Sequence, residues 1–329
     1  MAPVDLWSLT DLCTPWCVHV VATLRVAEHL ARGATTAADL AAATQSDPSA
    51  LTRVLTHLVS KGLFEEPSAG TFALNEAARP LLDPGVLLGL DLNGIGGRMA
   101  GAWSTLPTAV RTGEASFHEA FGQPFWAFLE SHPEVAASFD AFMGPAGHGA
   151  PDAGVLLDDD WSAIRTVVDV GGGTGALLSE ILRAHPHLTG TLVDLPGTVR
   201  RAMDVLGAAG VADRVTLRAQ SFFQPLPAGA DLYLLKSIMS DWPDREAAAI
   251  LTRCADAARP SGRVMILSGV APDDGPAPPD LLMLVLVGGK DRTLAEFRGL
   301  AASAGLTVLR AGRNLAGRFV VECGAERAS

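Results

Sequence analysis

The chain lacks most of the features that mark secreted, membrane-spanning and nucleic-acid-binding proteins. Its four cysteines form no C-x-x-C pair, which predicts reduced thiols in a cytoplasm. Residues 281–289 are apolar but far too few to cross a bilayer. Residues 1–5 have no basic region followed by an apolar stretch, so we expect no signal peptide. The formal net charge of −11 argues against binding to nucleic acid, because its phosphates would be repelled.

Patterns of metal ligands are equally scarce. His185 and His187 form an H-x-H pair at an expected helix end, without a nearby cysteine or third ligand in the sequence. Cys13 and Cys17 share one face of an expected helix, a spacing that favours packing in the core over chemistry. We therefore predict no metal site.

The chain is rich in apolar residues. Hydrophobic residues make up 48% of it and charged residues 19%, as in a well-buried globular protein. At 329 residues it exceeds one ordinary domain, so we expect two. Residues 144–151 have the glycine and proline content of a hinge. We place the boundary there, with one domain over residues 1–150 and a second over 151–329.

The first domain is expected to be mainly helical, because apolar residues recur at helical spacing over its first part. Expected elements are a helix opening at Thr36 with a start like a capping box, a helix over 49–62, a strand over 71–74, and helices over 98–112 and 124–143.

This order of elements resembles a winged helix-turn-helix. Between residues 34 and 64, however, only Arg53 and Lys61 are basic, too few to hold a phosphate backbone. A domain for dimerisation and for enclosing the substrate fits better. Because the first helices are rich in Leu, Val and Trp, we predict a homodimer built on residues 1–100.

Beyond residue 150 strands and helices alternate. Strands are expected over 166–170, 190–193, 215–219, 232–235, 264–268, 307–310 and 319–323, and helices over 174–184, 199–207, 245–258 and 293–303. This alternation predicts an α/β fold with a doubly wound, Rossmann-like sheet, in which the late pair of strands is a candidate for antiparallel pairing.

Residues 167–178 are the most informative part of the chain. A β-branched run leads into a glycine-rich turn and then into an apolar helix pattern, as in a buried parallel strand followed by a loop and a helix start. Glycine suits a turn in which the backbone touches a ligand or takes a positive φ. The next strand ends in Asp194, whose carboxylate can bind the two hydroxyls of a ribose. Together these features predict a nucleoside-cofactor site.

The glycine spacing alone leaves the cofactor open. Gly171, Gly173 and Ala176 satisfy a loose dinucleotide pattern, whereas Gly171, Gly173 and Gly175 satisfy the G-x-G-x-G turn of S-adenosylmethionine enzymes. Asp169 precedes the turn and favours a ligand with an ammonium and a sulfonium over a pyrophosphate, which a carboxylate would repel.

Nearly the whole chain resembles the caffeate-type family of S-adenosylmethionine-dependent O-methyltransferases, particularly the bacterial members that modify aromatic natural products. The resemblance lies in the motifs at residues 168–175, 193–196, 221–223, 234–236, 241–244, 259–263 and 288–293, and in 121–126 of the family's dimerisation domain. It implies a class I methyltransferase fold, S-adenosylmethionine as cofactor with S-adenosylhomocysteine as product, and an aromatic or polyketide-type acceptor.

The resemblance also implies roles for the cofactor-binding residues. The turn of Gly171, Gly173 and Gly175 would pass along the methionine part, with Asp169 near its ammonium. Asp194 would bind the ribose hydroxyls. The residues implied around the adenine are Leu195, Ser221, Phe222 and Lys236.

Two departures from the family concern catalysis. Ser240 stands where the family commonly has the histidine that serves as general base. Ser268 stands where it commonly has the glutamate that orients this histidine. A serine has no affinity for a proton at neutral pH, so Ser240 cannot replace the imidazole by itself.

Several explanations stay open. An acceptor that is already anionic needs no base, because alignment with the methyl donor suffices, and Ser240 could then hydrogen-bond to it. Asp241 or His148 could act as a substitute base. The cofactor's positive charge could instead serve chemistry other than methyl transfer, and carbon or nitrogen methylation also needs less help.

The resemblance implies an apolar acceptor pocket. With one tyrosine in the chain, aromatic stacking there must come from Phe and Trp. The implied lining residues are Met99, Trp103, Trp126, Phe139, Phe142, Met143, Met239, Met283 and Leu286.

Overall fold

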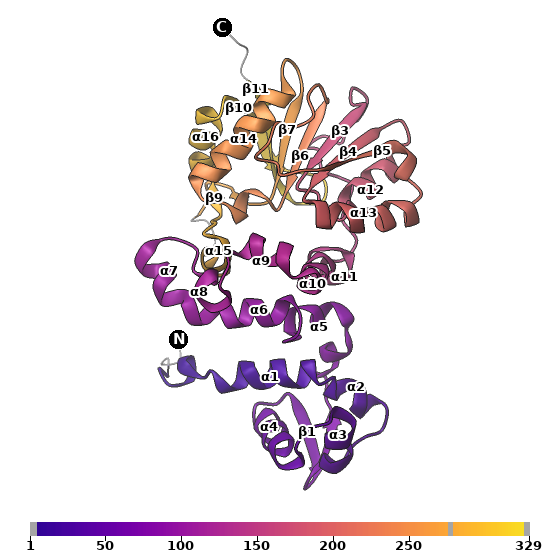
Figure 1. Cartoon of the computed structure of the whole chain (residues 1–329), viewed down its shortest axis with the longest axis vertical. Coiled ribbons are helices and arrows are strands. Elements are labelled where there is room, and N and C mark those ends of the chain that lie inside the picture. The colour runs from indigo at the N-terminus through magenta and orange to yellow at the C-terminus, as the bar shows by residue number, and fades with distance from the viewer. Residues whose placement is uncertain (1–4, 276–278, 326–329) are drawn as a thin grey trace. The chain divides into compact units, whose positions relative to one another are not determined.

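The computed structural model describes residues 5–275 and 279–325 (Figure 1). It separates into two compact units, Met1–Ala100 with Ala141–His148, and Gly101–Asp140 with Gly149–Ser329. The expected domain boundary near residue 150 stays a prediction. Residues 1–4, which belong to the start that we expect to carry no signal peptide, lie outside the described residues. Among the helices of the described ranges, none has the length and hydropathy needed to cross a bilayer.

The first unit is built from short helices and one hairpin. Its elements are η1 (Ser8–Thr10), α1 (Cys13–Thr23), α2 (Val26–Ala31), α3 (Ala37–Thr44), α4 (Pro48–Ser60), β1 (Phe64–Ser68), β2 (Thr71–Leu74), η2 (Arg79–Leu82), α5 (Pro84–Leu90), α6 (Ile95–Ala102) and α11 (Pro145–His148).

Side-chain caps fix where α3 and α4 begin. The Thr36 side chain accepts a hydrogen bond from Asp39 N at the start of α3. Asp47 accepts one from Ala50 N at the start of α4, and Pro48 occupies the first turn. The apolar face of α4 then packs into the core of the unit with Leu51, Leu55 and Leu58 buried. The helices opening at Thr36 and over 49–62 and the strand over 71–74 are found as predicted, and this strand, β2, pairs with β1, which was not predicted.

The second unit is built on a seven-stranded sheet in the order β10-β11-β7-β6-β3-β4-β5. The strands are β3 (Thr166–Val170), β4 (Thr189–Asp194), β5 (Val215–Ala219), β6 (Leu232–Lys236), β7 (Arg263–Leu267), β10 (Leu306–Arg313) and β11 (Phe319–Ala325). All neighbours pair in parallel except β11, which is antiparallel to both β10 and β7. The predicted doubly wound sheet and its late antiparallel strand are confirmed.

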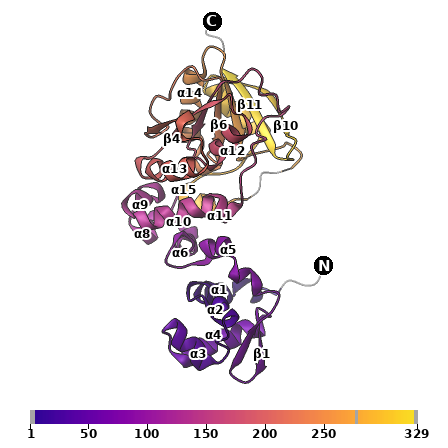
Figure 2. The same cartoon turned by 90° about the vertical axis from the view of Figure 1, so that its right-hand side faces the viewer.

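Helices cover both faces of this sheet (Figures 1 and 2). On one side α12 (Ala176–Ala184) and α13 (Pro196–Ala208) pack on Val167 and Leu234. On the other, α14 (Asp244–Ala258) and α16 (Leu294–Ser303) pack on Val168 and Leu235. Because successive side chains of a strand point to opposite faces, strands buried on both faces read as continuous apolar runs in the sequence.

Further helices of the second unit lie beyond the carboxyl ends of the strands. They are η3 (Trp103–Thr105), α7 (Leu106–Thr112), α8 (Phe117–Phe121), α9 (Phe125–Ser131), α10 (Pro133–Met143), η5 (Met239–Asp241) and α15 (Leu281–Val287). The single turn η4 (Ala212–Arg214) precedes β5. A two-residue parallel bridge joins β8 (Val270–Ala271) to β9 (Arg292–Thr293).

Three expectations need correction. The helix expected over 98–112 is divided, because α6 ends at Ala102 and Pro107 lies in the first turn of α7. The helix expected over 124–143 is divided before Pro133, which opens α10. The segment expected to be a hinge contains one helical turn, α11.

Candidate active site

The candidate site lies where the strand order of the sheet reverses. β3 pairs with β4 on one side and with β6 on the other, so the loops that follow these strands diverge at this point. In open α/β sheets ligands bind in the crevice outside the carboxyl ends of the strands at such a reversal. The predicted cofactor residues Asp169, Asp194 and Lys236 come from the carboxyl ends of β3, β4 and β6.

The turn after β3 favours glycine at three positions. Gly171, Gly173 and Gly175 have φ angles of 67°, 60° and 77°, a region that costs any other residue free energy. Gly171 N donates to Val193 O at 2.8 Å. A Cβ on Gly171 would lie 2.5 Å from Ile238 Cδ1, whereas one on Gly173 would meet nothing within 4 Å. The turn is therefore packed on its inner side and open at Gly173.

The carboxylate of Asp194 is fixed by backbone amides. Its Oδ2 accepts from Gly173 N at 2.8 Å and its Oδ1 from Leu195 N at 2.7 Å. Burial raises the pKa of Asp194 to about 6, and the two amide hydrogen bonds oppose the rise. Gln220 N also donates to the main-chain oxygen of Asp194 at 2.9 Å, which joins the ends of β4 and β5. Each carboxylate oxygen can still accept one further hydrogen bond.

Asp169 is the least satisfied polar group of the site. It is 1% exposed, and its Oδ2 has no hydrogen-bond partner among the described residues. Burial and the nearby Asp194 raise the pKa of Asp169 to about 7. A buried carboxyl group without a partner costs free energy, so this atom is prepared for a donor that binds from outside the chain.

The other predicted cofactor residues surround this pair. Lys236 ends β6, and burial and the neighbouring Arg318 lower its pKa. Leu195 opens α13. Ser221 Oγ accepts from Phe223 N at 3.3 Å, and the ring of Phe222 borders the inner side of the glycine turn.

An aromatic cluster adjoins the glycine turn. Phe222 meets Trp242 edge to face, with ring centroids 5.8 Å apart. Trp242 is nearly parallel to Trp126 at 6.0 Å, and Trp126 meets Phe139 edge to face at 5.8 Å. Trp126 Nε1 is buried and finds no partner among the described residues. The predicted acceptor residues Trp126 and Phe139 thus form one cluster with the predicted adenine neighbour Phe222.

Ser240 and Asp241 lie together in η5. Ser240 Oγ donates to Asp241 Oδ1 at 3.4 Å. Burial raises the pKa of Asp241 to about 7, and the carboxylates of Asp280 and Asp291 add to the rise. A carboxyl group with this pKa can accept a proton near neutral pH.

The buried guanidinium of Arg292 holds the η5 segment. It is 1% exposed and donates to Met239 O at 2.6 Å, to Trp242 O at 2.8 Å and to Asp244 Oδ1 at 2.9 Å. Its own place is fixed because Arg292 pairs with Val270 across the β8–β9 bridge.

Two glycines also pack closely against the backbone of Ser240, and two nearby serines have unusual backbone angles. A Cβ on Gly269 would lie 2.7 Å from Ser240 N, and one on Gly289 would overlap Ser240 O. Ser237 and Ser268, which follow β6 and β7, have φ angles of 56° and 108°. Non-glycine residues in this region cluster at functional sites.

The remaining predicted residues are placed differently. Trp103 is 43% exposed, Met283 and Leu286 lie on α15 beside η5, and Met239 is fully buried in the core. His148 and Met143 belong to the other compact unit. There the Nδ1 atom of His148 is hydrogen-bonded to Phe142 O, and the His148 side chain is exposed.

Sequence reasoning missed two arginines near the site. Arg292 lies in the motif 288–293, but only the structure reveals that its side chain points to η5. Arg201 of α13 pairs with Asp140 of α10 at 2.5 Å, and both charges act on Asp194. No sequence spacing links these residues, since the pair depends on how α13 packs on α10.

A hollow at the opposite edge of the sheet does not share these features. It holds about 280 Å³ at the amino ends of the strands, lined by Thr166, Thr189 and Arg214 among others. The glycine turn and the carboxyl groups with raised pKa lie at the opposite, carboxyl edge. The chemistry therefore belongs to that edge.

The sheet order, the glycine turn and the carboxylate that ends β4 define a nucleoside-cofactor enzyme of the class I methyltransferase type. An O-methyltransferase domain model matches residues 103–307, and an O-methyltransferase dimerisation domain model matches residues 7–84. The chain belongs to this O-methyltransferase family, as predicted.

Relatives and solved structures agree. The chain is 43% identical over 312 residues to a 2,7-dihydroxy-5-methyl-1-naphthoate 7-O-methyltransferase of Streptomyces carzinostaticus, with 93% of each covered. It is 39% identical to the aclacinomycin 10-hydroxylase of Streptomyces purpurascens, over 93% of this chain and 84% of that one. An O-methyltransferase from neocarzinostatin biosynthesis, solved with S-adenosylmethionine and 2-hydroxy-5-methyl naphthoic acid, has a TM-score of 0.92 at 41% identity, covering 99% of this chain and 100% of that one.

Proposed function

We propose that the chain transfers a methyl group from S-adenosylmethionine to a hydroxyl of an aromatic or polyketide-type acceptor. The observation that carries this proposal is the buried carboxyl oxygen of Asp169, which has no partner within residues 5–275 and 279–325, beside an open glycine turn and Asp194. Relatives that methylate a naphthoate and bind a naphthoic acid support the class of acceptor.

The residues present fit this cofactor. An ammonium would give Asp169 Oδ2 the donor that it lacks, as a charge-assisted hydrogen bond. The free acceptor positions of Asp194 would bind the ribose hydroxyls, and Leu195, Ser221, Phe222 and Lys236 would border the adenine. When bound, the cofactor supplies an electrophilic methyl group on a sulfonium.

The acceptor would lie against the aromatic cluster. Trp126 and Phe139 offer apolar rings, and Trp126 Nε1 offers a buried hydrogen-bond donor that has no partner among the described residues. A donor of this kind orients a carbonyl or phenolate oxygen. Trp103, Met143, Met239, Met283 and Leu286 stay proposed lining residues, and Met239 would need a rearrangement to touch a ligand because it is fully buried.

Catalysis would proceed by proximity and orientation. Alignment of reactants can supply about 7–11 kcal/mol of the barrier reduction, and an acidic phenol that is already ionised needs no base. The Ser240 hydroxyl would then hydrogen-bond to the acceptor oxygen. Where the acceptor is not ionised, Asp241 would take its proton, because its pKa is raised to about 7 by burial. His148 is the other candidate base.

A second function is favoured by a specific observation. By the family resemblance, Ser240 and Ser268 stand where the base and its orienting residue are common, and a relative at 39% identity is named a hydroxylase. In this alternative the cofactor is bound without losing its methyl group. Methylation at carbon or nitrogen is a further variant of the main proposal.

Product masses distinguish these functions. Purified protein is incubated with S-adenosylmethionine and a panel of hydroxynaphthoates and polyketide phenols. Methyl transfer adds the mass of one methylene to an acceptor and leaves one equivalent of S-adenosylhomocysteine. An altered acceptor with intact S-adenosylmethionine would support the alternative instead. Asp194→Ala should abolish cofactor binding in calorimetry, whereas Asp204→Ala, an exposed carboxylate on α13, should not.

We also propose a homodimer built on residues 1–100 and a cytoplasmic location, with no nucleic-acid partner. The dimerisation-domain match and the exposed side chains of Trp7, Leu9, Leu12 and Trp16 support the dimer. The free cysteines and the net charge of −11 support the location and the lack of a nucleic-acid partner. Light scattering that gives the mass of a single chain would contradict the dimer.

A further inference from the structure

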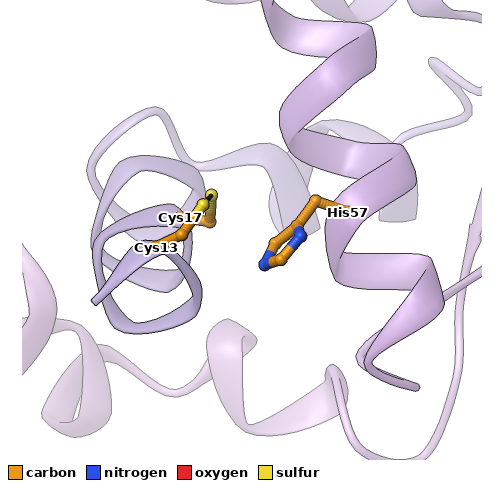
Figure 3. Close-up of side chains that lie close together, drawn as sticks. All are labelled: Cys13, Cys17 and His57. Carbon is orange, nitrogen blue, oxygen red and sulfur yellow. Dashed lines mark hydrogen bonds between the residues drawn. The ribbon is translucent and has the colours of Figure 1, made fainter. Parts of the chain in front are cut away.

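Three metal-ligating side chains meet in the helical unit, apart from the candidate active site (Figure 3). Cys13 and Cys17 lie one turn apart on α1, and His57 reaches toward them from α4. One ligand atom from each residue lies within 4.8 Å of the other two. The sequence spacing of the two cysteines predicts only packing in the core. It gives no sign of His57, because the approach of this residue depends on how α4 packs against α1.

The spacing of the two thiols matches tetrahedral coordination. Their Sγ atoms are 3.8 Å apart. Two thiolates bound to one zinc ion at about 2.3 Å, across a tetrahedral angle, are also separated by about 3.8 Å. A sulfur and an imidazole nitrogen in such a site are about 3.6 Å apart, so only the ring of His57 has to move closer.

The cluster combines an inner ligand with an entry path. Cys17 is buried, His57 is half-buried and Cys13 is exposed. A cation can therefore reach the thiol of Cys13 from water, while Cys17 is held in place by the core of the unit. These side chains come from helices of 11 and 13 residues, which hold ligands more firmly than loops do.

One nitrogen of the His57 imidazole is held by a hydrogen-bonded neighbour. Thr14 Oγ1 donates to Asp11 Oδ2 at 2.5 Å and is 2.8 Å from His57 Nε2. Asp11 is thus linked to the imidazole through the hydroxyl group of Thr14. Hydrogen-bonded links of this kind orient histidine ligands in metal sites. Lys61 Nζ lies 3.2 Å from the same Oδ2 atom of Asp11.

We propose that Cys13, Cys17 and His57 form a binding site for a thiophilic divalent cation of the zinc class. Two thiolates and an imidazole select such a cation over magnesium or calcium, which prefer oxygen ligands. Binding releases the protons of the two thiols to solvent, and water fills the fourth position. The bound ion links α1 to α4 and so stabilises the helical unit.

The test uses the full chain, reduced with a phosphine and freed of metal by a chelator. Cobalt(II) is titrated first, because its bonds to thiolates give a strong near-ultraviolet charge-transfer band. We expect this band to saturate at one cobalt per chain and to disappear when zinc is added. The thermal unfolding midpoint should rise with zinc, because an ion that binds only the folded state stabilises it.

Variants locate the site. Cys13→Ser and Cys17→Ser should each abolish the band and lower zinc affinity by at least about 100-fold. His57→Asn keeps both thiols, so it should weaken binding and shift the band. Cys254→Ala and His118→Asn remove a thiol and an imidazole outside the cluster, and both should bind as the unaltered chain does.

Several outcomes would overturn the proposal. One is the absence of a thiolate–cobalt band at one equivalent, and another is a band that persists in Cys13→Ser. Should a cysteine variant fail to fold by circular dichroism, His57→Asn decides alone, because an unchanged zinc affinity in that variant contradicts the site.

Discussion

Replacing Asp169 by asparagine keeps the shape of the side chain and removes its charge, so it isolates what the buried carboxylate does. In the protein without ligand, burial and Asp194 raise the pKa of Asp169 to about 7 from an ordinary 3.8. One pKa unit corresponds to about 1.4 kcal/mol. Ionising this group in the folded chain therefore costs about 4 kcal/mol more than in the unfolded chain.

The sign of the pH dependence follows from linkage. A folded-state pKa that is raised gives stability that is complete below about pH 4 and is lost as the pH rises through about 7. Between pH 4 and pH 8 the ligand-free chain should lose on the order of 4 kcal/mol of unfolding free energy through Asp169. Asp169→Asn should lack this loss, while the smaller contribution of Asp194, whose pKa is about 6, remains in both proteins.

Binding of an ammonium beside Asp169 should reverse this effect. The positive charge favours the carboxylate, so binding below pH 7 releases a proton and affinity rises with pH by up to about tenfold per unit. Calorimetry with S-adenosylhomocysteine, in buffers of different ionisation enthalpy, measures the released proton. Asp169→Asn should bind more weakly and release less.

The matched control is Asp204→Asn, an exposed carboxylate on α13. It should leave both the unfolding curves and the proton release unchanged. If urea unfolding of Asp169→Asn has the same pH dependence as the unaltered chain, and binding releases the same proton, then Asp169 is not the ammonium site.

Three further substitutions test the rest of the site. Arg292→Lys keeps the charge, but one ammonium cannot bond both Met239 O and Trp242 O as the guanidinium does. Urea unfolding should therefore show a loss of about 2–3 kcal/mol in the free energy of unfolding. An unchanged unfolding midpoint would show that Arg292 does not hold η5. For acceptors that ionise below neutral pH, the pH–rate profile should follow each acceptor's own pKa, and Asp241→Asn should change kcat by less than about threefold. If all acceptors instead share one pKa near 7, and it vanishes in Asp241→Asn, then Asp241 is the base. Trp126→Phe keeps a ring and removes the buried N–H, so the acceptor KM should rise by about tenfold while the affinity for S-adenosylhomocysteine stays constant. Equal KM values in the variant and the unaltered chain would exclude a hydrogen bond from Nε1 to the acceptor.

The sheet could be predicted because its strands are buried on both faces. Residues 232–235 are apolar throughout, residues 166–170 are apolar apart from Thr166 and Asp169, and both runs are followed by turns and correspond closely to β6 and β3. The strand β1 was missed, because Glu65, Glu66 and Pro67 are residues that strands rarely contain. It forms because it pairs with β2 and buries Phe64, which is a tertiary effect.

Only the part of the candidate site that lies at consecutive strand ends could be predicted from the sequence. Asp169, the glycine turn and Asp194 belong to two consecutive strand ends, so a parallel sheet brings them together. The Arg292 clamp and the approach of His57 to Cys17 join residues far apart in sequence. Their distances depend on helix packing, for which no local spacing provides a signal.

The way η5 is held bears on the proposed reaction, in which Ser240 stands at the position where the family commonly has a histidine. A segment kept only to carry a base would be free to loosen once the base was gone. Here the backbone around Ser240 is instead fixed by the buried guanidinium of Arg292 and by close contact with Gly269 and Gly289. Fixed geometry is what a reaction by proximity requires, because an error of about 1 Å can reduce the rate by about 100-fold. The rigidity of this segment therefore supports a positioning role for Ser240 in place of proton transfer.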